Sequence, residues 1–393
     1  MLETLSPLEH SIELDLAERA ADGAILNLSG AAFVGEYLYL ANDEGRELLR
    51  LRRGASSPHV YDRSKAIDIA SLFRLEDKEL DPREEFDLEA LTLDRASDDS
   101  VRLWMIGSHA MGHRKPKGAT LKRLGLKRQR NRLLFACVEL DDRGAIRRKS
   151  GRHLRIEPAG QTYTTGFLSA LRAARPRADG FLREVSALTE AKIPARIADG
   201  VGWFTPYTLA STKENGLDIE GLAIRRRDDD PSSVVAHVGL RGPVIDGLAV
   251  VIEIDIRDHN KRGLKIASGP RFHLLDLCGF GVRDLEWDNN DLLILAGPTM
   301  TRQKESVLFR WRDANGANAE RSVNDVREVR AIRPIGRLPM APDCGGPEVI
   351  TWLGRNSPDC MVLRDGIKGP RLVDRHGRPS RAGPIYRAEV YRV

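Results

Sequence analysis

The sequence predicts an all-β fold, a β-propeller of five blades, with six blades as the alternative. Three observations predict it: a short segment recurs along the chain, short apolar strands follow each copy, and no long apolar or helical pattern dominates. The chain has 393 residues, of which 41% are hydrophobic and 30% charged, as is ordinary for a globular protein. We therefore expect a single propeller domain over residues 1–393.

The recurring segment places a carboxylate at the start of an apolar strand. It reads FDLEALTLD at 86–94, LDIEGLAIR at 217–225, VRDLEWD at 282–288 and GPEVITWLG at 346–354, with a weaker copy, LNLSGAAFV, at 26–34. The aligned residues are Ser29, Glu89, Glu220, Asp284 and Glu348, separated by 60, 131, 64 and 64 positions. A repeat of about 60 residues with about four short strands is typical of a propeller blade.

The two ends of the chain are expected to close the propeller together. The last copy is followed by DCMVLRDG and the terminal IYRAEVYRV, which makes only three strands. HSIELDL, near the N-terminus, supplies the missing fourth strand. Pairing the N- and C-terminal strands in one blade removes the open sheet edges that invite aggregation.

The interval of 131 residues predicts an insertion at residues 113–205, within or after the second blade. It starts with a basic loop and continues with two helix-like stretches. Their apolar faces are Phe167, Leu168 and Leu171, after Thr165, and then Phe181, Leu182, Val185 and Leu188.

The basic loop at 113–132 is the strongest charge feature of the chain. Nine basic residues lie within nineteen positions: Arg114, Lys115, Lys117, Lys122, Arg123, Lys127, Arg128, Arg130 and Arg132. No aromatic residue among them could stack on bases, so we interpret the loop as a solvated connection and do not expect nucleic acid as a partner. A contact with nucleic-acid phosphates stays the alternative.

Composition and the chain start predict a cytoplasmic protein without membrane association. No run of 18 apolar residues occurs, and MLETLSPLEHSIELDL lacks the basic start and apolar stretch of a signal peptide. The cysteines form no CxxC pair, so we expect free thiols in a reducing compartment rather than a zinc cluster. They are Cys137, Cys278, Cys344 and Cys360.

Several of these segments resemble a known family. LDIEGLAI, GLRGPVIDGLAVVIEID and GVRDLEWDNNDLLILAGPT resemble the bacterial propellers grouped as domain of unknown function 3616, most specifically over residues 213–299. The resemblance covers most of the chain and implies a soluble propeller, without an activity. More distantly, the Glu-Gly-Leu-Ala pattern is similar to esterase-like phytase and gluconolactonase-type propellers. That likeness implies blade-start acids around a calcium ion, although fold does not fix function.

The first strand of each propeller blade lines the central channel, so the aligned acids are expected to converge there. They are Glu89, Glu220, Asp284 and Glu348. Such a group of ionised acids needs protonation, basic partners or a cation, and oxygen ligands favour Ca²⁺. Two interpretations stay open: a calcium site, or a structural ring in which the acids cap backbone N–H groups or pair with Arg241 and Arg283. Ser29 departs from the ring and leaves one side open.

The rim of the same mouth supplies candidate residues for chemistry. His109 is the expected general acid or base, and Arg241 the group that orients an anionic substrate. Asp43, Lys213 and Arg283 are the further candidates for substrate binding.

Two classes of function follow from this pattern. The first is a calcium-dependent hydrolase acting on a phosphoester, an ester or a lactone, with a small anionic substrate. The second is a non-catalytic binding or scaffold propeller, whose partners use the channel rim or the basic loop.

Overall fold

The computed structural model describes residues 2–393 apart from several segments. These are 17–26, 44, 56, 74–79, 82, 96–99, 114–125, 160–161, 175–202, 213–214, 228–229, 231, 260–262, 300–304, 315–325, 330, 341–344, 355–356 and 365–384. In the described part, no helix has the length and apolar character needed to cross a membrane.

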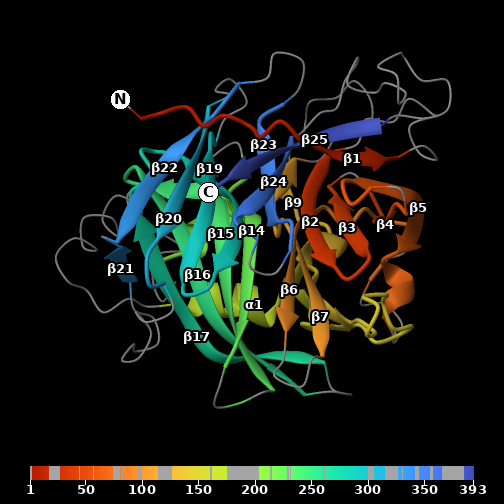
Figure 1. The fold of residues 1–393 in the computed structure, drawn as a ribbon. Helices are drawn as coiled ribbons and strands as arrows, with labels where there is room; N and C mark the ends of the chain where they lie inside the picture. Colours follow the sequence, from red (N-terminus) through yellow and green to blue (C-terminus); the bar gives the residue numbers. More distant parts are fainter. Residues whose placement is uncertain are drawn as a thin grey trace, which may run out of the picture.

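The strands form five antiparallel groups of four, which are the blades of a propeller (Figure 1). Blade 1 contains β2 (Leu28–Val34), β3 (Tyr37–Asn42), β4 (Glu47–Arg53) and β5 (Val60–Asp68). Blade 2 contains β6 (Leu88–Arg95), β7 (Val101–Gly107), β10 (Phe135–Glu139) and β11 (Arg152–His153). Blade 3 contains β14 (Asp218–Arg226), β15 (Ser233–Ile245), β16 (Leu248–Asp258) and β17 (Leu264–Leu275).

The last two blades complete the ring. Blade 4 contains β18 (Gly281–Asp288), β19 (Asp291–Gly297), β20 (Ser306–Trp311) and β22 (Ile332–Leu338). Blade 5 contains β23 (Pro347–Trp352), β24 (Asp359–Arg364), β25 (Ile385–Arg392) and β1 (Ile12–Asp15). The first strands contact one another in the cycle β2, β6, β14, β18, β23 and back to β2, so the ring closes with five blades.

Strand β1 closes the propeller, as the sequence predicts. It pairs antiparallel with β25, with Ile12 opposite Ala388, and lies beside it in Figure 1. Its other edge pairs in parallel with β5, with Glu13 opposite Val60, and so joins blades 1 and 5 into one sheet. Both edges of β1 are therefore hydrogen-bonded.

Apolar side chains between adjacent blades form the core. Blade strands are covered on both faces, so β16 holds eight consecutive buried residues from Ala249 to Ile256 instead of an alternating pattern. Blades 3 and 4 approach closely at two glycines. A Cβ atom on Gly221 would lie 2.9 Å from Leu285, and one on Gly239 would lie 2.4 Å from Val282. Larger residues at these positions would force the blades apart.

The inserted region interrupts blade 2 between β7 and β10 and continues after β11, and its helix α1 (Gly166–Ala173) contacts β17 of blade 3. Between β7 and β10 lie β8 (Gly112–His113), β9 (Leu126–Lys127) and the 3₁₀ turn η3 (Asn131–Leu133). After β11 follow β12 (Ile156–Ala159), β13 (Thr162–Thr165), α1 and α4 (Thr205–Leu209). A second 3₁₀ turn, η2 (Ala70–Leu72), follows β5, and β21 (Val326–Val329) adds a parallel fifth strand to β17.

Helix α1 confirms the first of the two helix-like stretches. The Thr165 hydroxyl caps it by accepting a hydrogen bond from the Leu168 N–H at 3.2 Å, and its predicted apolar face is buried. The second stretch, at 181–188, lies outside the described residues. Cys137, Cys278 and Cys360 are free thiols, and Cys344 also lies outside the described part.

Candidate ligand site at the channel mouth

Each first strand of a blade carries a one-residue bulge near its start. The strand registers skip one residue in every case: Ser29, Glu89, Glu220, Arg283 and Glu348. A bulged residue has no partner in the ladder, which re-aims its side chain. All five bulged residues lie at the same end of the channel, where they line one cavity.

The alignment of the fourth copy is wrong by one residue. Arg283, not Asp284, occupies the bulge of β18. Asp284 instead joins blades 4 and 5, because its carboxylate accepts hydrogen bonds from the N–H groups of Leu285, at 2.8 Å, and Ile350, at 2.9 Å. Burial raises its pKa well above the ordinary value, against the effect of the bond from Ile350. Of the two interpretations of the ring, the backbone cap describes Asp284.

A cavity of about 210 Å³ lies among the bulged residues. It is lined by Asn27, Leu28, Ser29, Asp43, Asp87, Glu89, Ala110, Arg132, Thr212, Asp218, Glu220, Arg241, Arg283 and Glu348. Among the described residues, this lining contains six carboxylates against three guanidinium groups and no histidine. The cavity therefore has an excess of negative charge if all of its groups are ionised.

Two arginines neutralise one side of the cavity. Arg241, on β15, pairs with Asp218 and, at 2.7 Å, with Glu220. Arg283 pairs with Glu220, at 2.9 Å, and with Glu348. Burial alone lowers the pKa of Arg241, but Glu220 and Asp218 raise it overall above the ordinary value. Glu220 is thus held between two guanidinium groups and is compensated by basic partners.

Glu89 lies on the other side of the cavity, where its charge raises the pKa of Arg241 and Arg283 although it forms no ion pair with either. Burial raises the pKa of Glu89 well above its ordinary value, and Asp87, Glu220, Asp218 and Asp43 raise it further. No basic side chain among the described residues forms an ion pair with it. Glu89 is therefore the carboxylate of this cavity most in need of a proton or of a further positive charge.

Asp87 and Asp218 also line the cavity, and the sequence pattern did not single them out. Each stands two positions before a bulged glutamate, in DLE at 87–89 and DIE at 218–220, so a repeated Asp-x-Glu was the available signal. Asp87 receives a hydrogen bond from the Ser108 hydroxyl and pairs with Arg132 at 3.1 Å. Burial raises the pKa of Asp87 despite the opposing effect of Arg132.

The basic loop is only partly solvated. Arg132 lines the cavity, and Arg130 donates to the Tyr163 hydroxyl at 2.6 Å. Arg128 is buried and donates to the main-chain oxygens of His109, at 3.1 Å, and Thr208. The interpretation as a solvated connection is wrong for these three residues. Arg128 joins the loop after β7 to α4, Arg130 contacts β13, and Arg132 pairs with Asp87 at the start of blade 2. Residues 114–125 lie outside the described part.

His109 does not reach the cavity. Its backbone adopts a φ of 53°, and its ring packs edge-on against Phe167 of α1 with centroids 5.4 Å apart. Its Nδ1 atom lies 2.8 Å from the Gly107 carbonyl, which fixes the proton on that nitrogen. Burial lowers the pKa of His109 to about 3. Its predicted role as general acid or base at this mouth has no geometric support.

Of the remaining predicted residues, two line the cavity and one lies outside the described part of the chain. Asp43 lines the cavity, as does Ser29, whose hydroxyl donates to the Leu88 carbonyl instead of leaving an open side. Lys213 lies outside the described residues. Of the candidates on the rim, the structure therefore brings Asp43, Arg241 and Arg283 together with Glu89, Glu220 and Glu348.

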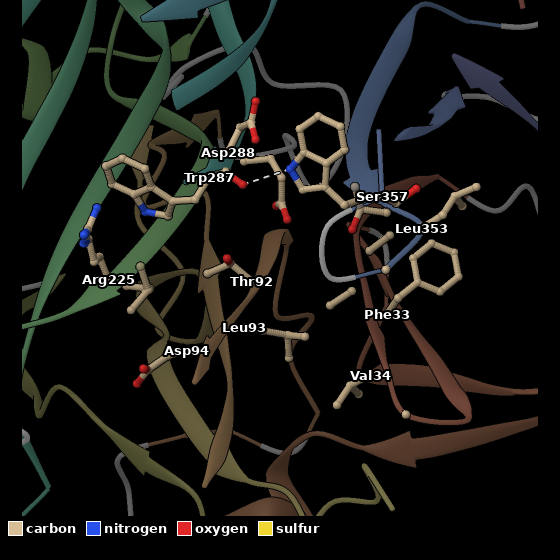
Figure 2. Close-up of a pocket in the computed structure, with 18 of the residues that line it drawn as sticks. Phe33, Val34, Thr92, Leu93, Asp94, Arg225, Trp287, Asp288, Leu353 and Ser357 are labelled. Atoms are coloured by element: carbon tan, nitrogen blue, oxygen red, sulfur yellow. Dashed lines mark hydrogen bonds between the residues drawn. The ribbon is translucent and has the colours of Figure 1, made fainter. Parts of the chain in front are cut away.

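The opposite mouth of the channel holds a larger pocket of about 580 Å³, at the ends of the same first strands (Figure 2). Phe33 and Leu353 lie on one side of it, and Trp287 with Arg225 on the other. The indole N–H of Trp352 donates to the Trp287 carbonyl at 2.9 Å, the dashed line in Figure 2. Glu286 also lines this pocket, and burial raises its pKa to about 8.

Fold and site together define a five-bladed β-propeller with a charged channel mouth. The family described as "Protein of unknown function (DUF3616)" matches residues 27–378, and the chain belongs to this family. No curated protein matches the chain.

Two solved structures are among the similar ones found. One is a crystal structure of Myxococcus xanthus glutaminyl cyclase, with 9% identity, a TM-score of 0.34 and complete coverage of both chains. The other is the computationally designed Ika8 protein, with 8% identity, a TM-score of 0.29 and coverage of 98% of this chain and 100% of that one. Scores this low carry no argument about function.

Proposed function

We propose that the channel mouth of this propeller binds a calcium ion beside Glu89. The observation that carries the proposal is the uneven charge of the cavity. Glu220 and Glu348 share Arg283, and Asp87 has Arg132, whereas the acids around Glu89 add to its negative charge. A buried carboxylate without an ion-pair partner costs several kcal/mol, so a cation beside Glu89 would relieve this cost.

The ligand chemistry favours a hard cation. Carboxylates from three blades line the cavity together with Glu89 of β6: Asp43 follows β3, Asp87 directly precedes β6, and Asp218 starts β14. Calcium accepts six to eight oxygens in irregular geometry, with water completing the set, whereas magnesium requires a near-ideal octahedron. An ion here would connect blades 1, 2 and 3 at the axis.

The size of the cavity favours an ion over an organic substrate. At about 210 Å³ it is smaller than the cavities of roughly 300–1,000 Å³ that enclose drug-sized ligands. Arg241 is occupied by Asp218 and Glu220, and no histidine is in the described lining. Calcium-dependent hydrolysis of a phosphoester, an ester or a lactone is a separate, catalytic extension of this proposal. It requires a substrate oxygen on the ion.

Calorimetric titration tests the ion. Chelator-treated protein is titrated with calcium chloride, alongside the Glu89→Gln variant and a matched control, Glu348→Gln, in which the altered acid faces Arg283. We expect binding by the wild-type protein, at least a 100-fold loss in Glu89→Gln, and less than a tenfold loss in the control. The proposal fails if the wild-type protein binds no calcium at millimolar concentration and its melting temperature does not change with calcium. Glu89 would then be protonated.

Catalysis is tested with the same preparations. Hydrolysis of 4-nitrophenyl phosphate, 4-nitrophenyl acetate and a γ-lactone is followed with calcium and with EDTA. A rate that needs calcium and disappears in Glu89→Gln would support the hydrolase. Calcium binding without any such rate would leave a binding propeller.

The second candidate function is non-catalytic binding of a small organic molecule at the opposite mouth. Its pocket of about 580 Å³ falls within the usual range for ligand cavities and combines aromatic side chains with charged residues of both signs. Ligand-induced melting shifts, compared between wild type and Trp352→Ala, test it. Hits that stabilise both proteins equally would place binding elsewhere.

A further inference from the structure

Three side chains that can bind metals meet inside blade 3, and none of them lines either of the two pockets described above. They are His237 on β15, Glu253 on β16 and His273 on β17, and each is only 1% exposed. His237 lies directly opposite Glu253 in the strand register. His273 lies opposite Val251, two residues from Glu253 and hence on the same face of the sheet. Three adjacent strands thus direct an imidazole, a carboxylate and an imidazole to one point.

Their ligand atoms are close to the spacing of a zinc centre. The Oε2 atom of Glu253 lies 2.8 Å from Nε2 of His273 and 3.8 Å from Nε2 of His237, and the three ligand atoms lie within 4.8 Å of one another. Zinc bonds of about 2.0–2.2 Å in a tetrahedron place ligand atoms roughly 3.4 Å apart. The distances fall on both sides of this value, so small side-chain rotations would complete the geometry.

The surroundings supply the outer contacts that such a centre needs. Arg271 holds the other oxygen of Glu253, with Nε at 2.8 Å and Nη2 at 2.7 Å, and so leaves Oε2 directed at the imidazoles. Asp255 lies 3.1 Å from Arg271 and offsets its charge. The rings of Trp287 and Trp311 pack edge-on against His237, with centroids 5.1 and 6.1 Å away.

We infer that His237, Glu253 and His273 bind a zinc ion that stabilises blade 3. Two neutral imidazoles and one carboxylate suit zinc, whereas calcium requires oxygen ligands, so this site is chemically distinct from the channel mouth. Zinc would link three strands in their middle, and water would occupy the fourth position. The competing arrangement is a metal-free network in which His273 donates to Glu253.

Metal analysis of the full chain, made without a histidine tag and supplied with zinc during expression, tests the inference. His237→Gln and His273→Gln are compared with His59→Gln, the same substitution in blade 1. We expect about one zinc per chain in the wild type, in His59→Gln and in Glu89→Gln, and a loss of at least tenfold in the two cluster variants, with native circular dichroism. Removing zinc from the wild type should lower its melting temperature by several degrees.

Cobalt substitution gives a second measurement that needs no variant. Cobalt(II) bound to the wild type should show the intense visible absorption of four-coordinate cobalt, and a hundredfold excess of calcium should not displace it. A wild type without zinc and without this spectrum would overturn the inference, as would zinc retained in both folded cluster variants. Loss of calcium binding in Glu89→Gln with zinc unchanged would separate this site from the channel mouth.

Discussion

Arg283 of blade 4 occupies the bulge position that Glu220 holds in blade 3, and the two side chains meet, with Nε of Arg283 2.9 Å from Oε2 of Glu220. Arg283 also contacts Glu348 of blade 5. One arginine in a ring of acids thus joins three consecutive blades through charge. Because Glu220 and Glu348 are compensated by this residue, the excess negative charge of the mouth falls on the Glu89 side.

Replacing Arg283 should be strongly destabilising. Arg283→Met keeps much of the side-chain volume but removes the guanidinium group. Glu348 then loses its pair with Arg283, and Glu220 keeps only its pair with Arg241. Breaking a buried pair by removing one member costs about 3–5 kcal/mol. We expect a loss of about 3 kcal/mol in urea unfolding. Arg52→Met, which breaks a pair with the exposed Glu36, should cost under about 1 kcal/mol. Equal losses in both variants would contradict the role of Arg283.

Replacing Asp284 should weaken the contact between blades 4 and 5 without lowering the affinity for calcium. In Asp284→Asn, one oxygen that accepts an N–H group becomes an NH₂ group facing a donor, at Leu285 or at Ile350. An unsatisfied buried group costs about 1–3 kcal/mol, and we expect a loss of that size in unfolding experiments. Calcium affinity should stay within threefold of the wild type. A calcium affinity reduced as far as in Glu89→Gln would instead return Asp284 to the metal site.

Most of the fold could be predicted from the sequence because its signals are local. The apolar segments after each blade start, the cap at Thr165 and the strand at the N-terminus each lie within about ten residues, and the structure confirms them. Five copies of one segment then determine the number of blades. Such signals can be read from neighbouring residues alone, because the periodicity of apolar residues in a strand or helix does not depend on distant contacts.

The site could be predicted only in part, because it depends on single-residue registers and on long loops. Matching by chemical type selected Asp284, whereas the bulge of β18 presents Arg283. His109 follows β7 as a rim residue should, but its positive φ and the packing of α1 turn it into the core. Arg132 reaches Asp87 from a loop whose path the sequence does not specify.

The N-terminal strand should be essential for stability although it has only four residues. Leu14 of β1 is fully buried in the apolar cluster between blades 1 and 5. Truncating a buried leucine to alanine costs about 2–5 kcal/mol. Leu14→Ala should therefore lower the free energy of unfolding by about 3 kcal/mol, whereas Leu209→Ala, at a leucine that is 40% exposed, should cost under about 1 kcal/mol. A Leu14→Ala variant as stable as the wild type would mean that blade 5 closes without β1.

Glu286 should make the stability depend on pH at the wide mouth of the channel. Burial raises the pKa of its carboxyl from 4.5 to about 8 in the folded protein. Between these two values the folded state binds more protons than the unfolded state, so the contribution of Glu286 to stability is complete below pH 4.5 and falls as pH rises to 8. Glu286→Gln, which resembles the protonated form, should remove this slope.

The comparison is made by urea unfolding at pH 5.5 and pH 8.5, with Glu305→Gln as the control because the Glu305 side chain is 54% exposed. At pH 8.5 we expect Glu286→Gln to exceed the wild type by about 1–3 kcal/mol, since each pKa unit corresponds to about 1.4 kcal/mol and partial exposure reduces the full effect. The difference should shrink at pH 5.5, and the control should follow the wild type at both values. A Glu286→Gln variant that is less stable than the wild type at pH 8.5 would indicate that the ionised carboxylate has a favourable partner in this pocket, such as a bound cation.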